Sequence, residues 1–97
     1  MKTKKISIVT PVLNEIDSLP RYIEALNNFI NSYGQGYIFE VIILDNNSTD
    51  NSYSYLKDKA QLDCEKSLIK FSKNIGYQLS ILHGLKKASG DCAIVVD

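Results

Sequence analysis

Tryptophan is absent from this chain of 97 residues, which has one methionine, two cysteines and two prolines. Neither positive nor negative charge is in excess, because eleven Lys and Arg residues balance eleven Asp and Glu residues. A net charge of zero removes the basic surface expected of a nucleic-acid-binding protein. No apolar run approaches the roughly 20 residues that a membrane-spanning helix needs. We therefore expect a soluble domain that does not bind nucleic acid.

The two cysteines, Cys64 and Cys92, show neither a CxxC motif nor the spacing of metal ligands. Two buried, reduced thiols in a cytoplasmic protein explain them most simply. The apolar stretch from Ile6 to Leu13 is short and is interrupted by Pro11, so it predicts a strand rather than a signal peptide. Residues 1–97 are predicted to form a single domain with one modest core, too small to add a separate catalytic lobe.

Four short apolar runs predict strands at residues 6–9, 41–44, 68–71 and 93–96. The second and fourth runs are continuous and rich in β-branched residues, which is typical of strands buried on both faces of a parallel sheet. The segments between the runs have helical patterns. Alternating strands and helices predict a Rossmann-like, three-layer α/β/α domain with a mostly parallel sheet of about four strands.

Three helices are predicted between these strands. The first runs from Leu19 to Tyr33, with Ser18 as its N-cap and Gly34 ending it. The second begins near residues 48–50. The third runs from about residue 77 to 88 and ends before Gly90. We expect its buried face to consist of Ile81, Leu82, Leu85 and Ala88.

Polar side chains follow each predicted strand. Ligands of parallel α/β sheets bind outside the carboxyl ends of the strands, so these residues are expected to meet. They are Thr10, Pro11, Asn14 and Glu15 after the first strand, Asp45, Asn46 and Asn47 after the second, Ser72, Lys73, Asn74 and Gly76 after the third, and Asp97 after the fourth. Such a set suits a base, a ribose and a divalent cation beside a diphosphate. Neither a P-loop nor a dinucleotide-binding glycine motif is present.

Each of these residues also has a purely structural explanation. Asp45 and Asn47 could cap the second helix, and Lys73 could be a solvated surface charge. Asn14 and Glu15 could be ordinary loop residues. The lone histidine His83 lies on the third helix without a second ligand nearby in the sequence, which favours packing or solvation over metal binding.

Four ordered blocks, ISIVTPVLNE, VIILDNNSTDNS, SKNIGYQLSILHGLKKASGD and AIVVD, together cover nearly the whole chain. In this order the blocks resemble the amino-terminal half of a family 2, GT-A type glycosyltransferase. The resemblance implies that the chain is the donor-nucleotide-binding portion of a longer protein, ending at the first acid of a DxD motif. It implies a nucleotide-sugar donor, UDP- or GDP-linked, with Mn²⁺ or Mg²⁺ as cofactor.

Carried over residue by residue, the resemblance implies a nucleotide site made of Thr10, Pro11, Glu15, Asp45, Asn47, Lys73, Asn74, Gly76 and Asp97. Asp97 is also the implied metal ligand. Asn46 and Asn47 depart from the Asp and Gly that many members carry at these positions. The groups that orient the acceptor and remove its proton would lie beyond Asp97, so no catalytic residue is expected within this chain.

Two alternatives come from related folds. A receiver-like signalling module needs an acidic cluster after the first strand, where this chain has a single Glu15. A sugar-nucleotide pyrophosphorylase needs a loop rich in glycine and arginine there. The resemblance further implies that the full-length protein acts in the cytoplasm, at the cytosolic face of the membrane if its acceptor is lipid-linked. We expect strand 93–96 to lie at a sheet edge and to promote self-association into a dimer, which light scattering would measure.

Overall fold

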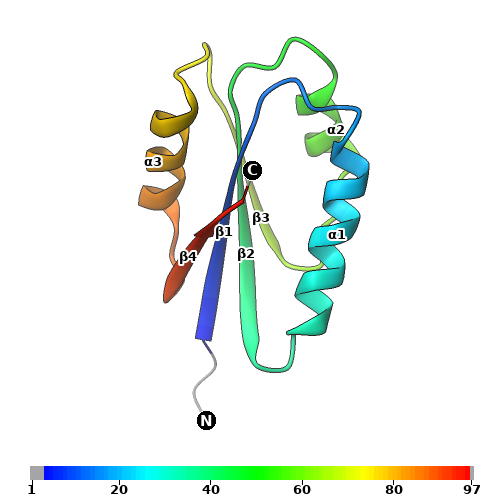
Figure 1. Cartoon of the computed structure of the whole chain (residues 1–97), viewed down its shortest axis with the longest axis vertical. Helices are drawn as coiled ribbons and strands as arrows, with labels where there is room; N and C mark the ends of the chain where they lie inside the picture. The colour runs from blue at the N-terminus through cyan, green and yellow to red at the C-terminus, as the bar shows by residue number, and fades with distance from the viewer. Residues whose placement is uncertain (1–3, 97) are drawn as a thin grey trace.

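The computed structural model describes residues 4–96 and confirms the predicted three layers (Figure 1). A four-stranded parallel sheet has the order β3-β2-β1-β4, with α1 and α2 on one face and α3 on the other. The elements in chain order are β1 (Lys4–Val12), α1 (Leu19–Ser32), β2 (Tyr37–Asp45), α2 (Ser52–Asp58), β3 (Glu65–Lys70), α3 (Tyr77–Lys87) and β4 (Cys92–Val95). A helix therefore joins each strand to the next along the chain, and such crossovers are what parallel strands require.

The two central strands, β1 and β2, are each longer than their apolar runs. Their pairing extends from Lys4 opposite Tyr37 to Val12 opposite Asp45. Thr10, Pro11 and Asp45 therefore lie within strands, where we had expected them to follow the strands. All three are buried, because the end of the sheet is covered by the loops that leave it.

The face under α1 and α2 holds the larger part of the core. The predicted apolar face of α1 is confirmed, since Leu19, Ile23, Leu26 and Ile30 are buried. These side chains pack against Ile8, Val12, Phe39, Val41 and Ile43 of the central strands. A smaller cluster of Val9, Ile42 and Leu44 lies on the opposite face, beneath α3.

The predicted buried face of α3 is wrong for its two leucines, whereas Ile81 and Ala88 are half-buried and Ala88 packs against the core. Leu82 and Leu85 are 47% and 42% exposed, whereas Ser80 and Gly84 are the buried residues of this helix. Small residues on the inner face let the helix backbone approach the sheet closely, and the leucines are thereby turned outward. The only histidine, His83, packs its ring 5.4 Å from that of Phe71, which agrees with the packing role expected from the sequence.

Strand β4 lies at the edge of the sheet, as predicted, but it is not buried on both faces. All four of its residues are exposed, including Ile94 and Val95. Cys92 opens this strand and is exposed, so the expectation of two buried thiols is wrong for it. Cys64 is half-buried, and burial raises the pKa of its thiol. Self-association through β4 stays a prediction.

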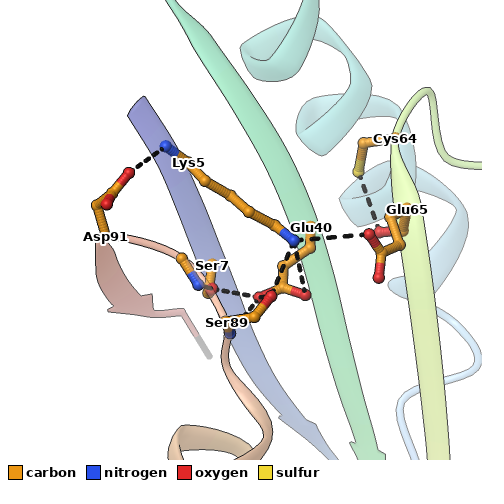
Figure 2. A network of polar contacts seen from close by, with 8 residues as sticks. Lys5, Ser7, Glu40, Cys64, Glu65, Ser89 and Asp91 are labelled. Atoms are coloured by element: carbon orange, nitrogen blue, oxygen red, sulfur yellow. Dashed lines mark hydrogen bonds and ion pairs between the residues drawn. The ribbon is translucent and has the colours of Figure 1, made fainter. Parts of the chain in front are cut away.

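A buried carboxylate, Glu40, ties the α3–β4 connection to the sheet (Figure 2). Its Oε2 accepts hydrogen bonds from Ser7 Oγ and from the backbone N–H of Ser89, at 2.5 and 2.7 Å. The Lys5 ammonium lies 3.7 Å from Oε1. Burial alone would raise the Glu40 pKa, but the hydrogen bonds from Ser7 and Ser89 and the charge of Lys5 outweigh it and lower the pKa.

Replacing Glu40 by glutamine should therefore destabilise the protein in a pH-dependent way. A pKa lowered by folding adds stability above the ordinary value of 4.5, and this stability is lost as the pH falls through the folded-state pKa. We expect Glu40→Gln to cost about 2 kcal/mol at pH 7 and less near pH 4. Urea unfolding at several pH values measures this difference, with exposed Glu24→Gln as the control. A loss that is the same at every pH would contradict the prediction.

Candidate functional site

The loops that leave β1, β2 and β3 meet at the carboxyl edge of the sheet, at the top of Figure 1. Each loop leads into a helix on one face, so the edge between the layers is open to a ligand. Hydrogen bonds between these loops position Asn14 and Asn46, two of the polar residues singled out from the sequence.

The loop after β1 is fastened to the loop after β2 by Asn14, which has a positive φ of 52°. Asn14 Oδ1 accepts hydrogen bonds from the backbone N–H groups of Thr49 and Asp50, at 2.7 and 3.2 Å. Its own N–H donates to Ser48 Oγ at 2.9 Å. Asn14 is thus a brace between the two loops, a role that neither the ligand-binding nor the ordinary-loop interpretation anticipated.

Asp45 is fully buried at the end of β2. Its Oδ2 accepts from the backbone N–H of Ser48 at 3.1 Å, and its Oδ1 accepts from Ser48 Oγ at 2.6 Å. The helix-capping alternative for Asp45 is wrong, because α2 has Asn51 at its N-cap without a side-chain capping bond. Asp45 instead holds the first turn of the loop that follows β2.

Asn46 connects all three loops, although nothing in the local sequence distinguishes it from Asn47. It is 4% exposed. Its backbone N–H donates to the carbonyl of Val12 at 2.9 Å, and its Oδ1 accepts from the backbone N–H of Ile75 at 2.9 Å. Asn47 is half-buried with a φ of 65°, and it provides the left-handed turn that follows.

Gly76 is the N-cap residue of α3 and has a φ of 91° and a ψ of 160°, a conformation that side-chain-bearing residues rarely adopt. The Gly76 N–H donates to Asn74 Oδ1 at 2.9 Å, which fixes the turn before the helix. A Cβ atom at Gly76 would meet no atom within 4 Å, so the space beside it is open. Lys73, in the same loop, is exposed.

These loops enclose a cavity of about 290 Å³. Four of the residues predicted to bind a nucleotide line it: Pro11, Glu15, Asn74 and Gly76. Thr10, Asp45, Asn47 and Lys73 are not part of the lining, and Asp97 lies outside the described residues. The remaining lining residues are Val12, Leu13, Asn46 and Tyr77. Of these, only Asn46 was among the polar residues expected at this edge of the sheet, and it was not assigned to the nucleotide.

A second cavity, of about 480 Å³, lies beside the beginning of α1 and shares Glu15 with the first. Thr10 reaches this cavity, and its Oγ1 accepts a hydrogen bond from the hydroxyl of Tyr22 at 3.0 Å. Thr10 and Pro11, adjacent in the sequence, thus point to opposite sides of β1, as successive residues of a strand do. Thr10 and Pro11 were both predicted to contact the nucleotide, but they line different cavities.

The cation implied by the family was tested against the chemistry of these side chains. Within residues 4–96, no group of three or more His, Cys, Asp and Glu residues is arranged to hold a metal ion. The residue expected to bind the cation, Asp97, falls outside that range.

A parallel sheet covered by helices on both faces, with a cavity at its carboxyl edge, is the architecture of the doubly wound α/β class, in which ligands bind at that edge. The chain belongs to glycosyl transferase family 2, whose model matches residues 7–97. The family expected from the four sequence blocks is thus confirmed.

Two individual proteins are similar to this chain. An undecaprenyl-phosphate 4-deoxy-4-formamido-L-arabinose transferase of Proteus mirabilis (strain HI4320) is 34% identical over 97 residues, which cover 99% of this chain and 29% of that protein. The structure of the mannosyltransferase PcManGT from Pyrobaculum calidifontis, in complex with GDP-Man and Mn²⁺, matches 93% of this chain and 26% of its own, with a TM-score of 0.66 and 23% identity. The chain thus spans less than a third of either protein, and the second likeness shows the fold alone.

Proposed function

We propose that this chain binds the nucleoside diphosphate of a UDP- or GDP-linked sugar, as the donor-binding part of a glycosyltransferase. The observation that carries the proposal is the cavity at the carboxyl edge of the sheet in a chain of family 2. The receiver-like alternative loses its basis, because the family is now known.

The lining of this cavity suits the two ends of a nucleotide. Leu13 and Tyr77 are 41% and 49% exposed and offer apolar surface to the face of a base. Gly76 lies at the N-terminus of α3, where backbone N–H groups and the helix dipole favour an anion. Because Gly76 has no side chain, a diphosphate can approach that backbone closely.

A divalent cation, Mn²⁺ or Mg²⁺, belongs to the same proposal. The mannosyltransferase that shares this fold was solved with GDP-Man and Mn²⁺. We propose Asp97 as a ligand of such an ion, with further ligands outside the described residues. The ion would offset the charge of the leaving diphosphate.

The acceptor proposed for the full-length protein is a lipid phosphate at the cytosolic face of a membrane. This proposal is supported by the Proteus mirabilis relative, which is an undecaprenyl-phosphate 4-deoxy-4-formamido-L-arabinose transferase. Among residues 4–96, no helix is both long enough and apolar enough to cross a bilayer.

Titration of the ¹⁵N-labelled chain with UDP and GDP, with and without Mg²⁺, tests nucleotide binding. We expect a Kd in the millimolar range, equivalent to about 4 kcal/mol, because the chain supplies only part of a donor site. The amide signals of Asn46, Asn74 and Gly76 should shift, and the shifts should saturate at lower nucleotide concentration with Mg²⁺. Unchanged spectra at about 20 mM of either nucleotide, well above that Kd, would overturn the proposed function.

A further inference from the structure

The outer side of α3 is apolar, although a helix that covers a sheet ordinarily turns its apolar side inward. Leu79, Leu82 and Leu85 recur at every third residue, which places them on one side of the helix, and they are 52%, 47% and 42% exposed. The buried positions of the helix are instead Ser80 and Gly84. In the described part of the chain no second helix lies on this face of the sheet (Figure 1). Large apolar side chains gathered in this way mark an interaction surface, here called the leucine surface of α3.

The charged residues around the leucine surface are lysines. Residues 72–90 contain Lys73, Lys86 and Lys87 but no aspartate or glutamate, although the whole chain has zero net charge. All three lysines are exposed, and two of them lie in the last turn of α3. The first carboxylate after the helix, that of Asp91, accepts a hydrogen bond from a backbone N–H at the beginning of β1, at 2.8 Å. The leucine surface therefore matches a partner that is both apolar and anionic.

A bilayer that contains anionic lipids has both of these properties. Leucine side chains can enter the boundary between head groups and acyl chains, while lysine ammonium groups stay beside the lipid phosphates. A nucleic acid would leave the leucines in water, and a second copy related by two-fold symmetry would bring lysines against lysines. The beginning of α3 also lies at the cavity, which Gly76 and Tyr77 line. A helix lying on a bilayer would thus hold that cavity near the membrane surface.

We propose that the leucine surface of α3, with the lysines around it, docks the protein on an anionic lipid bilayer. The helix lies along the membrane surface, with its leucines toward the lipid and its buried small residues toward the sheet. The choice of a bilayer rests on the proposed lipid acceptor. It does not rest on nucleotide binding, which is tested separately.

Sedimentation of the whole chain with lipid vesicles tests this proposal. Vesicles of equal parts phosphatidylglycerol and phosphatidylcholine should bind the wild type, and vesicles of phosphatidylcholine alone should bind it much more weakly. The double variant Lys86→Glu/Lys87→Glu should bind the anionic vesicles about thirtyfold more weakly, because each lysine near such a surface strengthens binding about fivefold. The double variant Leu79→Gln/Leu82→Gln should bind them about tenfold more weakly, because less apolar area enters the lipid.

Two control variants carry matched changes at other places. Lys57→Glu/Lys59→Glu makes the same charge change at the end of α2, on the opposite face of the sheet. Ile38→Gln replaces an apolar residue of β2 that is as exposed as the leucines. Both controls should bind the anionic vesicles within about threefold of the wild type, because distant surface charges are largely screened at about 0.1 M salt.

Wild-type chain that does not sediment with the anionic vesicles would overturn the proposal, as would equal losses in the α3 and α2 charge variants. A Leu79→Gln/Leu82→Gln protein that binds vesicles normally but loses a dimer in light scattering would also overturn it, and would assign the surface to a second copy. The variants should keep the UDP or GDP affinity of the wild type, since none of the substituted residues lines the cavity, and this shows that they are folded. Wild-type chain that binds vesicles but neither nucleotide would overturn the proposed nucleotide site and leave the docking surface standing.

Discussion

Replacing Asp45 by alanine should abolish nucleotide binding and also lower the stability of the fold. The substitution removes both acceptors of Ser48 at a fully buried position. The Ser48 N–H and hydroxyl would be left without their partner, which we expect to cost about 2 kcal/mol. For a domain of this size, that loss lowers the Tm by about 10 °C. Binding should fail because the same loop positions Asn46 at the cavity.

Thermal unfolding and UDP or GDP titration of the same samples separate the two effects of the Asp45 change. Asp58→Ala, an exposed carboxylate at the end of α2, is the matched control and should change neither. A variant that unfolds at a lower temperature but binds normally would show that the loop after β2 is no part of the site. A variant with unchanged Tm and no binding would make Asp45 a direct ligand, as the sequence suggested.

Replacing Gly84 by alanine should also destabilise the protein, although alanine is the better helix former. A Cβ atom at Gly84 would overlap Val9 Cγ1 and lie 2.8 Å from Leu44 Cδ1. Val9 and Leu44 are fully buried in the core beneath α3, so neither side chain can move without disturbing the sheet. The helix-propensity gain of about 1 kcal/mol is smaller than the overpacking cost, and we expect a net loss of about 2 kcal/mol.

Denaturant unfolding of Gly84→Ala measures this loss. The control is Gly36→Ala, at a position where a Cβ atom would meet nothing within 4 Å. We expect the control to stay within about 0.5 kcal/mol of wild type. Nucleotide binding should weaken in Gly84→Ala as well, because a helix pushed away from the sheet displaces Gly76 at its other end. A Gly84→Ala protein as stable as wild type would show that the helix and sheet are not in close contact.

Local sequence patterns were sufficient to predict the elements and their order. The apolar run 41–44 predicted a buried central strand, and the helical spacing from Leu19 to Ile30 predicted the face that α1 buries. Both predictions succeeded because residues a few positions apart decide helix and strand formation. The apolar side chains of both segments also pack in the core. The four motif blocks likewise predicted the family.

The same patterns failed where burial depends on contacts distant in sequence. The apolar run 93–96 has the composition of a central strand, yet its position at the sheet edge leaves Ile94 and Val95 exposed. Leu82 and Leu85 follow helical spacing, yet Ser80 and Gly84 face the sheet. Hydrophobicity indicates that a residue can be buried, but only the neighbouring element decides whether it is.

For the site, the sequence determined which polar residues follow the strands, and the tertiary structure decided which of them face the cavity. Thr10 and Pro11 are adjacent in the chain but point to opposite sides of β1. Asp45 is engaged within its own loop by Ser48, while Asn46 crosses to Ile75, 29 residues away, and lines the cavity. Side-chain direction depends on strand register and on hydrogen bonds between loops distant in sequence. The local pattern of residues determines neither of these.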